Sequence, residues 1–251
     1  MSARGFLGAG DLYARVYNPV TLAFDQWAGP FEASKFEIKP NSDLKEMTSR
    51  GRSTYGQVIE SVPLPKPADL SVTFSEVNKD SIAMALFGTS TVLNQGSGSV
   101  TDEALTASLG KFVKLAHDNI ATAGLVVTNS GQTTTYVLGT DYEVNYRLGM
   151  VKAITGGAIT DAQALKVDYT YNAIGGTSIA GGTQTQVRAQ FKLDGVNFAD
   201  QSQVIVDVYE AVLTPDSAFD FLQNDFADIQ LKGRLKTPAG KSEPFKVELR
   251  V

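Results

Sequence analysis

Apolar residues alternate with polar or charged ones along both ends of this chain, and this alternation constrains its fold more than any other feature. The pattern is clearest at Leu70–Phe74, Val187–Leu193, Ile229–Leu235 and Phe245–Val251. A period of two places one row of side chains in a core and the next in water, as in a strand of an antiparallel sheet. Asp194–Gly195 is expected to turn the chain toward a further strand at Val204–Leu213. The two ends therefore predict a mainly β core, an antiparallel sandwich or half-barrel.

One short α-helix is expected to flank this core. Asn78 is a favoured N-cap residue, and Gly88 suits the position just after a helix. Between them, Ile82 and Leu86 lie four residues apart and share one helix face. Before the helix, every second residue of Pro63–Pro67 is proline, which fits an extended edge strand better than a central one.

Asp43–Tyr55 is expected to be a long polar loop. It carries many charged and polar groups, and its sizeable apolar residues are Leu44, Met47 and Tyr55. Such a segment cannot bury enough apolar surface to order itself. We therefore expect something outside the loop to hold it in place.

Residues 96–186 differ in composition from the rest of the chain. They hold 13 of the 23 glycines, but 7 of the 27 acidic and 5 of the 22 basic side chains. Segments rich in Gly, Ser and Thr at Gly96–Ser99 and Gly175–Gln186 are typical of linkers. Between them, GTDYEVNYRLGMVKAI and Leu165–Tyr171 predict strands of a small β-sandwich. The sequence thus predicts a core domain of residues 1–95 and 187–251, interrupted by an inserted β domain at 96–186.

Composition argues against several classes of protein. The chain has no cysteine, so it has no disulfide, thiolate nucleophile or Cys-ligated metal. No run approaches the ~20 apolar residues of a membrane span, and no membrane partner is expected. The formal net charge of −5 argues against a nucleic-acid-binding module, which is usually basic. A polar, acidic wall would let a passing duplex slide, although mild acidity is also ordinary in proteins.

The sequence carries no enzyme signature. His117 is the only histidine, no nucleophile elbow lies near it, and a loop or strand-end position is expected. GRLKTPAGKS ends like a phosphate-binding loop, but Leu235 occupies the required first glycine position and a strand follows, so a turn is predicted. Asp216 and Asp220 are interpreted as caps of a helical turn at Ser217–Leu222. We expect no catalytic residue, no metal and no cofactor.

Five tyrosines gather in the insertion: Tyr136, Tyr142, Tyr146, Tyr169 and Tyr171. Tyrosines on strands are more often half-buried in a core. Exposed, coplanar tyrosines would instead stack on sugar rings. A carbohydrate- or host-surface-binding β module, such as an adhesin, is therefore an alternative function.

The order of elements along Asp43–Thr91, a polar loop, a proline-stiffened strand and a capped helix ending in ALFG, resembles the major tail tube protein of tailed bacteriophages. The N-terminal GAGDLYARVYNPVTLAFDQWAGPFEASKFEIKP also resembles the way these tube proteins begin. The resemblance implies hexameric rings that stack into a long, non-contractile tail, with a lumen that conducts DNA without binding it specifically. It also implies a structural role in the virion after assembly in the host cytoplasm. Copies of itself and the tape-measure, tail-tip and tail-terminator proteins are the implied partners.

Two sets of site residues follow from this resemblance. The polar loop is expected to contact the neighbouring ring through Lys45, Glu46, Arg50, Arg52 and Tyr55. The longest alternating strand is expected to line the lumen at Gln203, Asp207 and Tyr209. The insertion, whose cadence resembles β modules of phage tail and baseplate proteins, is expected on the outside of the tube. The tubes of contractile tails and of contact-dependent secretion share the ring fold and stay open as alternatives.

Overall fold

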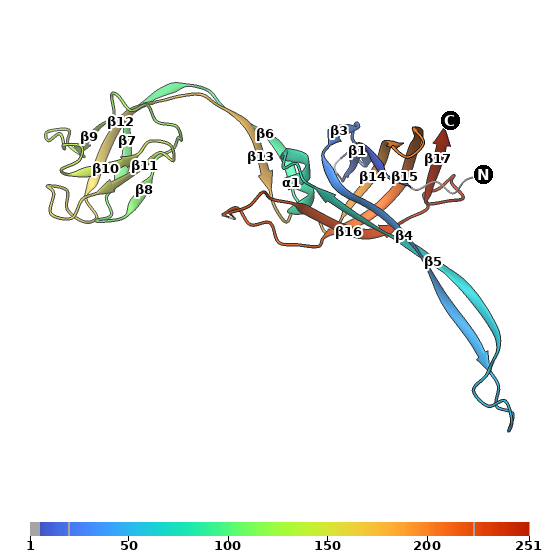
Figure 1. The fold of residues 1–251 in the computed structure, drawn as a ribbon. Coiled ribbons are helices and arrows are strands. Elements are labelled where there is room, and N and C mark those ends of the chain that lie inside the picture. Colours follow the sequence, from blue (N-terminus) through green and yellow to red (C-terminus); the bar gives the residue numbers. More distant parts are fainter. Residues whose placement is uncertain (1–5, 20, 223, 251) are drawn as a thin grey trace. The chain divides into compact units, whose positions relative to one another are not determined.

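The computed structural model describes residues 6–19, 21–222 and 224–250. Its strands and its one α-helix among these residues confirm the predicted mainly β fold class (Figure 1). The chain forms two compact units, which we call the core unit (Met1–Thr91 with Ile179–Val251) and the inserted unit (Val92–Ser178). Each unit encloses a hydrophobic core of its own.

Nine strands of the core unit form one antiparallel sheet. They are β1 (Gly8–Asn18), β2 (Ala23–Phe24), β3 (Ala28–Phe31), β4 (Ala33–Thr48), β5 (Val58–Phe74), β14 (Val187–Asn197), β15 (Ser202–Pro215), β16 (Ile229–Leu235) and β17 (Phe245–Arg250). The strand order is β2-β1-β14-β15-β16-β5-β4, with β17 paired to β15 and β3 paired to β1. The four alternating stretches thus lie within strands, although Val251 itself is outside the described residues.

The two ends of this sheet meet. β3 pairs with β1, and after Glu32 the chain continues as β4, which pairs with β5. Ser75 N–H donates to Glu32 O (3.0 Å), and the rings of Phe31 and Phe74 lie 5.3 Å apart. The sheet therefore curls around an enclosed interior. That interior includes the fully buried Leu12, Leu70, Phe191, Leu213 and Leu231.

Asp194–Gly195 is not the predicted turn. β14 runs through both residues and pairs with β1, so that Gly195 lies opposite Gly10. A Cβ on Gly10 would meet Gly195 Cα at 2.5 Å, so two bare backbones approach closely here. The chain turns instead after Asn197, whose side chain accepts a hydrogen bond from Ala199 N–H (3.2 Å). The glycines mark a close strand pairing, not a reversal.

The helix α1 (Lys79–Ala85) begins as predicted. The Asn78 side chain accepts two N–H groups of the first turn, at 3.0 Å each. The other end differs, because Phe87 rather than Gly88 adopts the left-handed conformation (φ 49°). Gly88 is required for space, since a Cβ there would meet Ala180 O at 2.9 Å.

The inserted unit contains two three-stranded sheets, β7-β12-β9 and β10-β11-β8. The strands are β7 (Gly98–Thr106), β8 (Phe112–Lys114), β9 (Val126–Asn129), β10 (Tyr142–Asn145), β11 (Met150–Ala153) and β12 (Ala164–Tyr171). Both sheets contribute to one core, with Val127 and Val167 from the first and Val151 from the second. This arrangement matches a small β-sandwich.

The boundaries of the inserted unit lie at residues 92 and 178, not at 96 and 186. The strands β6 (Thr89–Gln95) and β13 (Ile174–Ala180) pair with each other and contain both boundaries. The glycine-rich segment that was expected to be a linker is part strand. Its remainder belongs to the core unit and is held there by hydrogen bonds from Gly182 N–H to Leu86 O (2.8 Å) and from Gln184 N–H to Phe87 O (2.9 Å).

Candidate self-assembly surfaces

Residues 43–64 form a two-stranded arm, not the predicted loop. β4 continues to Thr48 and pairs with β5, with Asp43 opposite Leu64. Among the described residues, this part of β5 pairs with β4 alone, because β16 reaches only Asp69–Phe74 (Figure 1). The loop is thus limited to residues 49–57, which we call the tip. Backbone pairing orders a segment whose side chains could not order it by burial.

The tip is held by its own hydrogen bonds. Ser49 N–H donates to Gln57 O (2.7 Å), and Gly56 N–H donates to Ser49 O (2.9 Å). The Ser49 hydroxyl lies 2.6 Å from Thr54 Oγ1 and accepts a bond from Gly51 N–H (3.1 Å). These bonds order the tip within a single copy of the chain. An ordered tip loses less conformational entropy on binding than a flexible one.

The prolines of β5 lie in the arm and at its base. Pro63, Pro65 and Pro67 are alternate residues of the strand, and Pro63 and Pro65 lie opposite Leu44 and Ser42 of β4. Proline has no N–H to donate, so it is tolerated on the edge that faces away from the paired strand. The missing donors also make that edge a poor template for adding another strand. The arm is therefore suited to contacts through side chains.

Apolar side chains of the arm are exposed on both of its faces. They are Leu44 (55% exposed), Met47 (56%), Tyr55 (78%), Val58 (51%), Ile59 (58%), Val62 (45%) and Leu64 (46%). A two-stranded ribbon has no second layer that could bury them. Seven large apolar side chains exposed within one short ribbon are more than the single exposed residues that need no explanation, and such an accumulation marks interaction sites. The arm is therefore the first candidate interaction surface.

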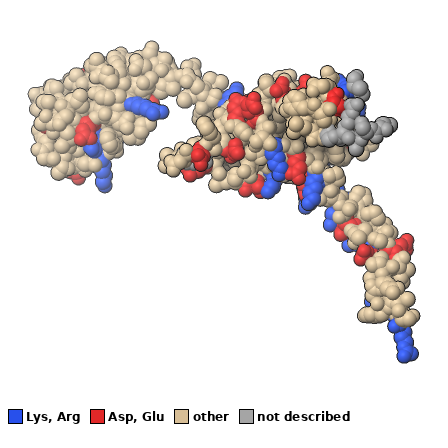
Figure 2. Space-filling view, viewed as in Figure 1, with Lys and Arg blue, Asp and Glu red and all other residues tan. Residues whose placement is uncertain are grey.

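The structure separates the five predicted contact residues. Lys45 and Glu46 lie on opposite faces of β4, with Lys45 Nζ 3.2 Å from the Asp43 carboxylate. Arg50, Arg52 and Tyr55 lie together in the tip, which contains no acidic residue. Neither arginine forms an ion pair with a described residue, and Figure 2 shows basic side chains at the far end of the arm. The end of the arm is thus basic and apolar.

The three predicted lumen residues share one face of β15. Gln203, Asp207 and Tyr209 alternate with buried valines that point into the core. Asp207 lies 3.0 Å from Lys192 Nζ of β14, and Lys241 Nζ lies 4.2 Å from the Tyr209 ring centre. The residues thus belong to one polar surface of the sheet.

Charges on this polar surface are paired rather than predominantly acidic. On β17, Glu248 lies 2.7 Å from Lys246 Nζ and 2.5 Å from Arg250 Nη2. The hydrogen bonds from Lys246 and then Arg250 lower the pKa of Glu248 to about 2. This surface is therefore polar, with acidic and basic side chains side by side.

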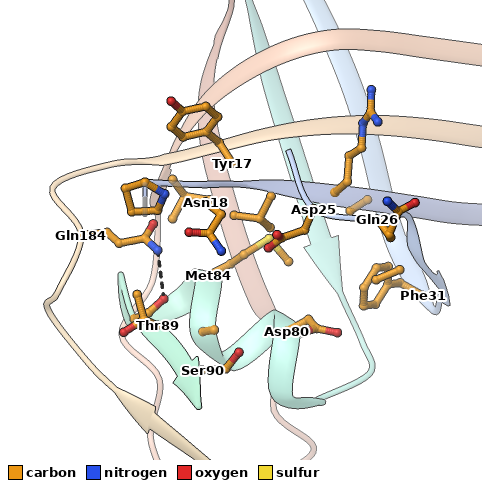
Figure 3. A pocket seen from close by; sticks show the side chains of 18 residues that line it. Tyr17, Asn18, Asp25, Gln26, Phe31, Asp80, Met84, Thr89, Ser90 and Gln184 are labelled. Atoms are coloured by element: carbon orange, nitrogen blue, oxygen red, sulfur yellow. Dashed lines mark hydrogen bonds between the residues drawn. The ribbon is translucent and has the colours of Figure 1, made fainter. Parts of the chain in front are cut away.

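The core unit also contains a cavity of about 210 Å³ beside α1. Figure 3 shows Asp25 above the helix that carries Met84 and Asp80, with all three lining this space. Arg15 lines it too, but its guanidinium group bonds Gln190 Oε1 (2.7 Å) and stacks on Trp27 (4.8 Å to the ring centre). The cavity thus has a mixed lining that includes two carboxylates, neither of which forms an ion pair with a described residue.

In the inserted unit, His117 occupies a loop as predicted and belongs to an aromatic network. Its ring stacks on Tyr171 (3.8 Å between centroids), and its Nδ1 lies 3.1 Å from Tyr169 Oη. Tyr169 Oη donates to Glu103 Oε2 (2.5 Å). Burial, and then the bond to Glu103, raise the pKa of Tyr169. Tyr169 is the buried member of this network, whereas His117, Tyr171 and Glu103 are partly exposed.

The other tyrosines of the insertion also belong to its core. Tyr136, Tyr142 and Tyr169 are at most 7% exposed, and Tyr146 and Tyr171 pack partly buried against the same cluster. These five residues therefore do not form the exposed, coplanar face on which the glycan-binding alternative depended. The interpretation of strand-borne tyrosines as core residues is confirmed.

The remaining sequence candidates fall in loops. GKS at 240–242 lies in the turn between β16 and β17 as predicted, with Gly240 in the left-handed region (φ 84°). Ser217–Leu222 is not helical, and Asp220 instead accepts a bond from Leu222 N–H (2.8 Å). No group of three acidic or histidine side chains is placed to hold a metal in the part of the chain that the structure describes. No helix within those same residues is long and apolar enough to cross a membrane.

The fold and these surfaces define a mainly β protein with a curled antiparallel sheet, a projecting two-stranded arm and an inserted β unit. The chain belongs to the family described as "Protein of unknown function UCP028589", whose model matches residues 5–243. The comparison with curated proteins finds no match to the chain.

Proposed function

We propose that this protein is a structural subunit whose copies close into hexameric rings that stack into the tail tube of a phage with a long, non-contractile tail. The resemblance of Asp43–Thr91 and of the N-terminal segment to major tail tube proteins supports the proposal. The observation that carries it is the arm, a ribbon ordered by its own hydrogen bonds. Seven of its large apolar side chains are between 45% and 78% exposed. Exposed apolar surface of this extent is typical of a site that binds a partner.

Energetic arguments favour a partner for the arm. Burying one half-exposed Val or Leu side chain contributes on the order of 1 kcal/mol. Several such contacts offset part of the cost of association, which is about 4–15 kcal/mol. A ring offers several arms at once, so weak single contacts add up to stable stacking.

In this proposal the lumen conducts DNA without binding it specifically and without a catalytic step. The polar surface that includes Gln203, Asp207 and Tyr209 presents paired charges. Paired charges neutralise few phosphates, so a duplex can pass without being held. Further proposed partners are a tape-measure protein inside the tube and tip and terminator proteins at its ends, with the assembled protein located in the virion. A contractile-tail or secretion tube would use the same ring contacts.

The first test is negative-stain electron microscopy with light scattering of the purified protein at low and high concentration. Rings or tubes with an open channel are the expected result. A monodisperse monomer at every concentration would contradict the proposal.

The second test reverses the charge of the tip with R50E/R52E. This variant should keep its fold by circular dichroism and lose stacking of the rings. A matched control is K111E/R147E, which makes the same charge change at exposed positions of the inserted unit. Equal loss of stacking in both variants would assign the effect to net charge and contradict the role of the tip.

A further inference from the structure

A second exposed apolar surface lies between β15 and β16. Phe221, Leu222 and Phe226 are 69%, 90% and 101% exposed. Phe219 packs against the core, and its ring lies 4.7 Å from that of Phe221 in an edge-on arrangement. The segment is thus fixed at one ring while its other large apolar side chains lie in water.

The three phenylalanines of this segment line a hollow of about 400 Å³. Its lining includes Val77, Phe219, Phe221 and Phe226, together with Asp220 and Asp225. Neither carboxylate forms an ion pair with a described residue, whereas nearby Asp216 is paired with Lys232 (2.6 Å). The hollow therefore combines aromatic walls with unneutralised negative charge.

The tip of the arm has the complementary chemistry. It carries Arg50 and Arg52 without an acidic residue, and Tyr55 is 78% exposed. Guanidinium groups bind carboxylates through charge-assisted hydrogen bonds and also stack on aromatic rings. Both surfaces belong to the core unit, so every copy of the chain carries one of each.

We propose that this hollow receives the tip of the arm from a second copy of the chain. Arg50 and Arg52 then meet Asp220 and Asp225, and Tyr55 packs among the phenylalanine rings. Because donor and acceptor are different surfaces, the contact is heterologous and repeats from copy to copy. The inference rests on the proposed function and identifies the acceptor of the arm.

The cavity beside α1 is a weaker acceptor. Asp80 lies in the first turn of the helix, where its carboxylate is already stabilised by the helix dipole. The aromatic side chains in the described lining of the cavity are Tyr17 and Phe31, and neither is exposed. The hollow has both unmatched charge and uncovered apolar surface.

Disulfide trapping tests the pairing directly, because the chain has no cysteine of its own. Two single-cysteine variants, S53C in the tip and L222C beside the hollow, are mixed and oxidised. We expect a crosslinked heterodimer at about tenfold the yield of a mixture of S53C with T122C, an exposed position in the inserted unit, which corresponds to about 1.4 kcal/mol of preference. Equal yields in the two mixtures would overturn the proposal.

Charge exchange provides the second readout. D220K/D225K should block assembly as R50E/R52E does, and a mixture of the two variants should assemble again. D11K/D194K, with the same change in charge at exposed sites of the core unit away from both the hollow and the cavity beside α1, should assemble normally. Assembly that survives D220K/D225K, or a control that fails equally, would reject the hollow as the acceptor while leaving the tube proposal intact. A wild-type chain that never assembles would reject both.

Discussion

Glu210 of β15 and Arg188 of β14 form a buried ion pair, with Glu210 Oε1 2.8 Å from Arg188 Nη2 and 2.9 Å from Nε. The Glu210 side chain is 4% exposed. Lys236 Nζ adds a third bond to the same oxygen at 3.2 Å, and the Arg188 guanidinium lies over the Tyr17 ring of β1 (4.0 Å). One carboxylate thus links three strands and the residue that follows β16.

The two cations should contribute unequally. R188M leaves the buried carboxylate with one exposed lysine, and removal of a partner from a buried pair typically costs about 3–5 kcal/mol, which we reduce to about 2–4 because Arg188 is 26% exposed. K236M removes a cation that is 56% exposed and should cost less than about 1 kcal/mol. Urea unfolding of both variants measures the difference. An equal fall in the free energy of unfolding in both variants would show that Lys236 stabilises the Glu210 carboxylate as much as Arg188 does.

The pairing of Gly10 with Gly195 predicts a site that tolerates no side chain. G10A would place its Cβ 2.5 Å from Asp194 O and from Gly195 Cα, both backbone atoms that cannot move aside. Overpacking of this kind typically costs about 1–3 kcal/mol, so the unfolding midpoint should fall. The matched control is G96A, where no atom lies within 4 Å of the new Cβ. A G10A variant as stable as G96A would show that the two strands can separate at no cost.

The sequence predicts the strands because their two-residue period reflects burial directly. Leu70–Phe74 and Val187–Leu193 lie in strands for this reason, and Asn78 predicts the start of α1 because capping is a local interaction. Close approach between distant segments leaves no such local signal. Gly195 and Gly88 both resemble turn residues in sequence, whereas each is required for space beside a backbone that only the fold brings near.

The two surfaces proposed for assembly were harder to predict. The arm has the composition of a loop, and only its register with β5 shows that it is a ribbon. Of the predicted contact set, Arg50, Arg52 and Tyr55 lie together in the tip, whereas Lys45 and Glu46 lie on the strand below it. Phe221, Leu222 and Phe226 were missed as a site, because their spacing resembles an ordinary buried segment until their exposure is known.

Asp141 should make the stability of the inserted unit depend on pH. Its carboxylate accepts bonds from Ala158 N–H and Val137 N–H, at 2.8 Å each, and these bonds lower its pKa from the usual 3.8. A lowered pKa in the folded state adds stability that is present above about pH 4 and is lost as the pH falls through the folded-state value. Thermal unfolding of the wild type between pH 6 and pH 2 should show this loss.

The D141N variant tests the assignment. Its unfolding temperature should be lower at neutral pH and should depend less on pH in the acidic range, because the amide does not titrate. D225N, at an exposed carboxylate of the core unit, serves as the control and should retain the wild-type dependence. An acid dependence that D141N leaves unchanged would assign the titration to another carboxylate.

Polar substitutions on the arm should separate assembly from folding. V62S/L64S replaces two side chains that are 45% and 46% exposed and that lie in a ribbon without a second layer, so unfolding of the core unit should change by less than about 1 kcal/mol. The concentration needed for assembly should rise, because the buried apolar contact is lost. Light scattering against concentration measures this, with V137S/L138S in the inserted unit as the control. Assembly at an unchanged concentration would show that Val62 and Leu64 lie outside the interface.

Excision of the inserted unit tests its expected position on the outside of the tube. The two hydrophobic clusters share no residue, so each unit should fold without the other. Residues 92–178 expressed alone should unfold cooperatively, and a chain in which a short Gly-Ser linker replaces them should still form rings and tubes. Electron microscopy should then show a narrower tube with an unchanged channel, because only outward mass is removed. If the channel of the wild-type tube is narrow or blocked and opens when the unit is excised, the unit lies in the lumen. If the excised variant folds but forms no rings, the unit is part of the contact between subunits.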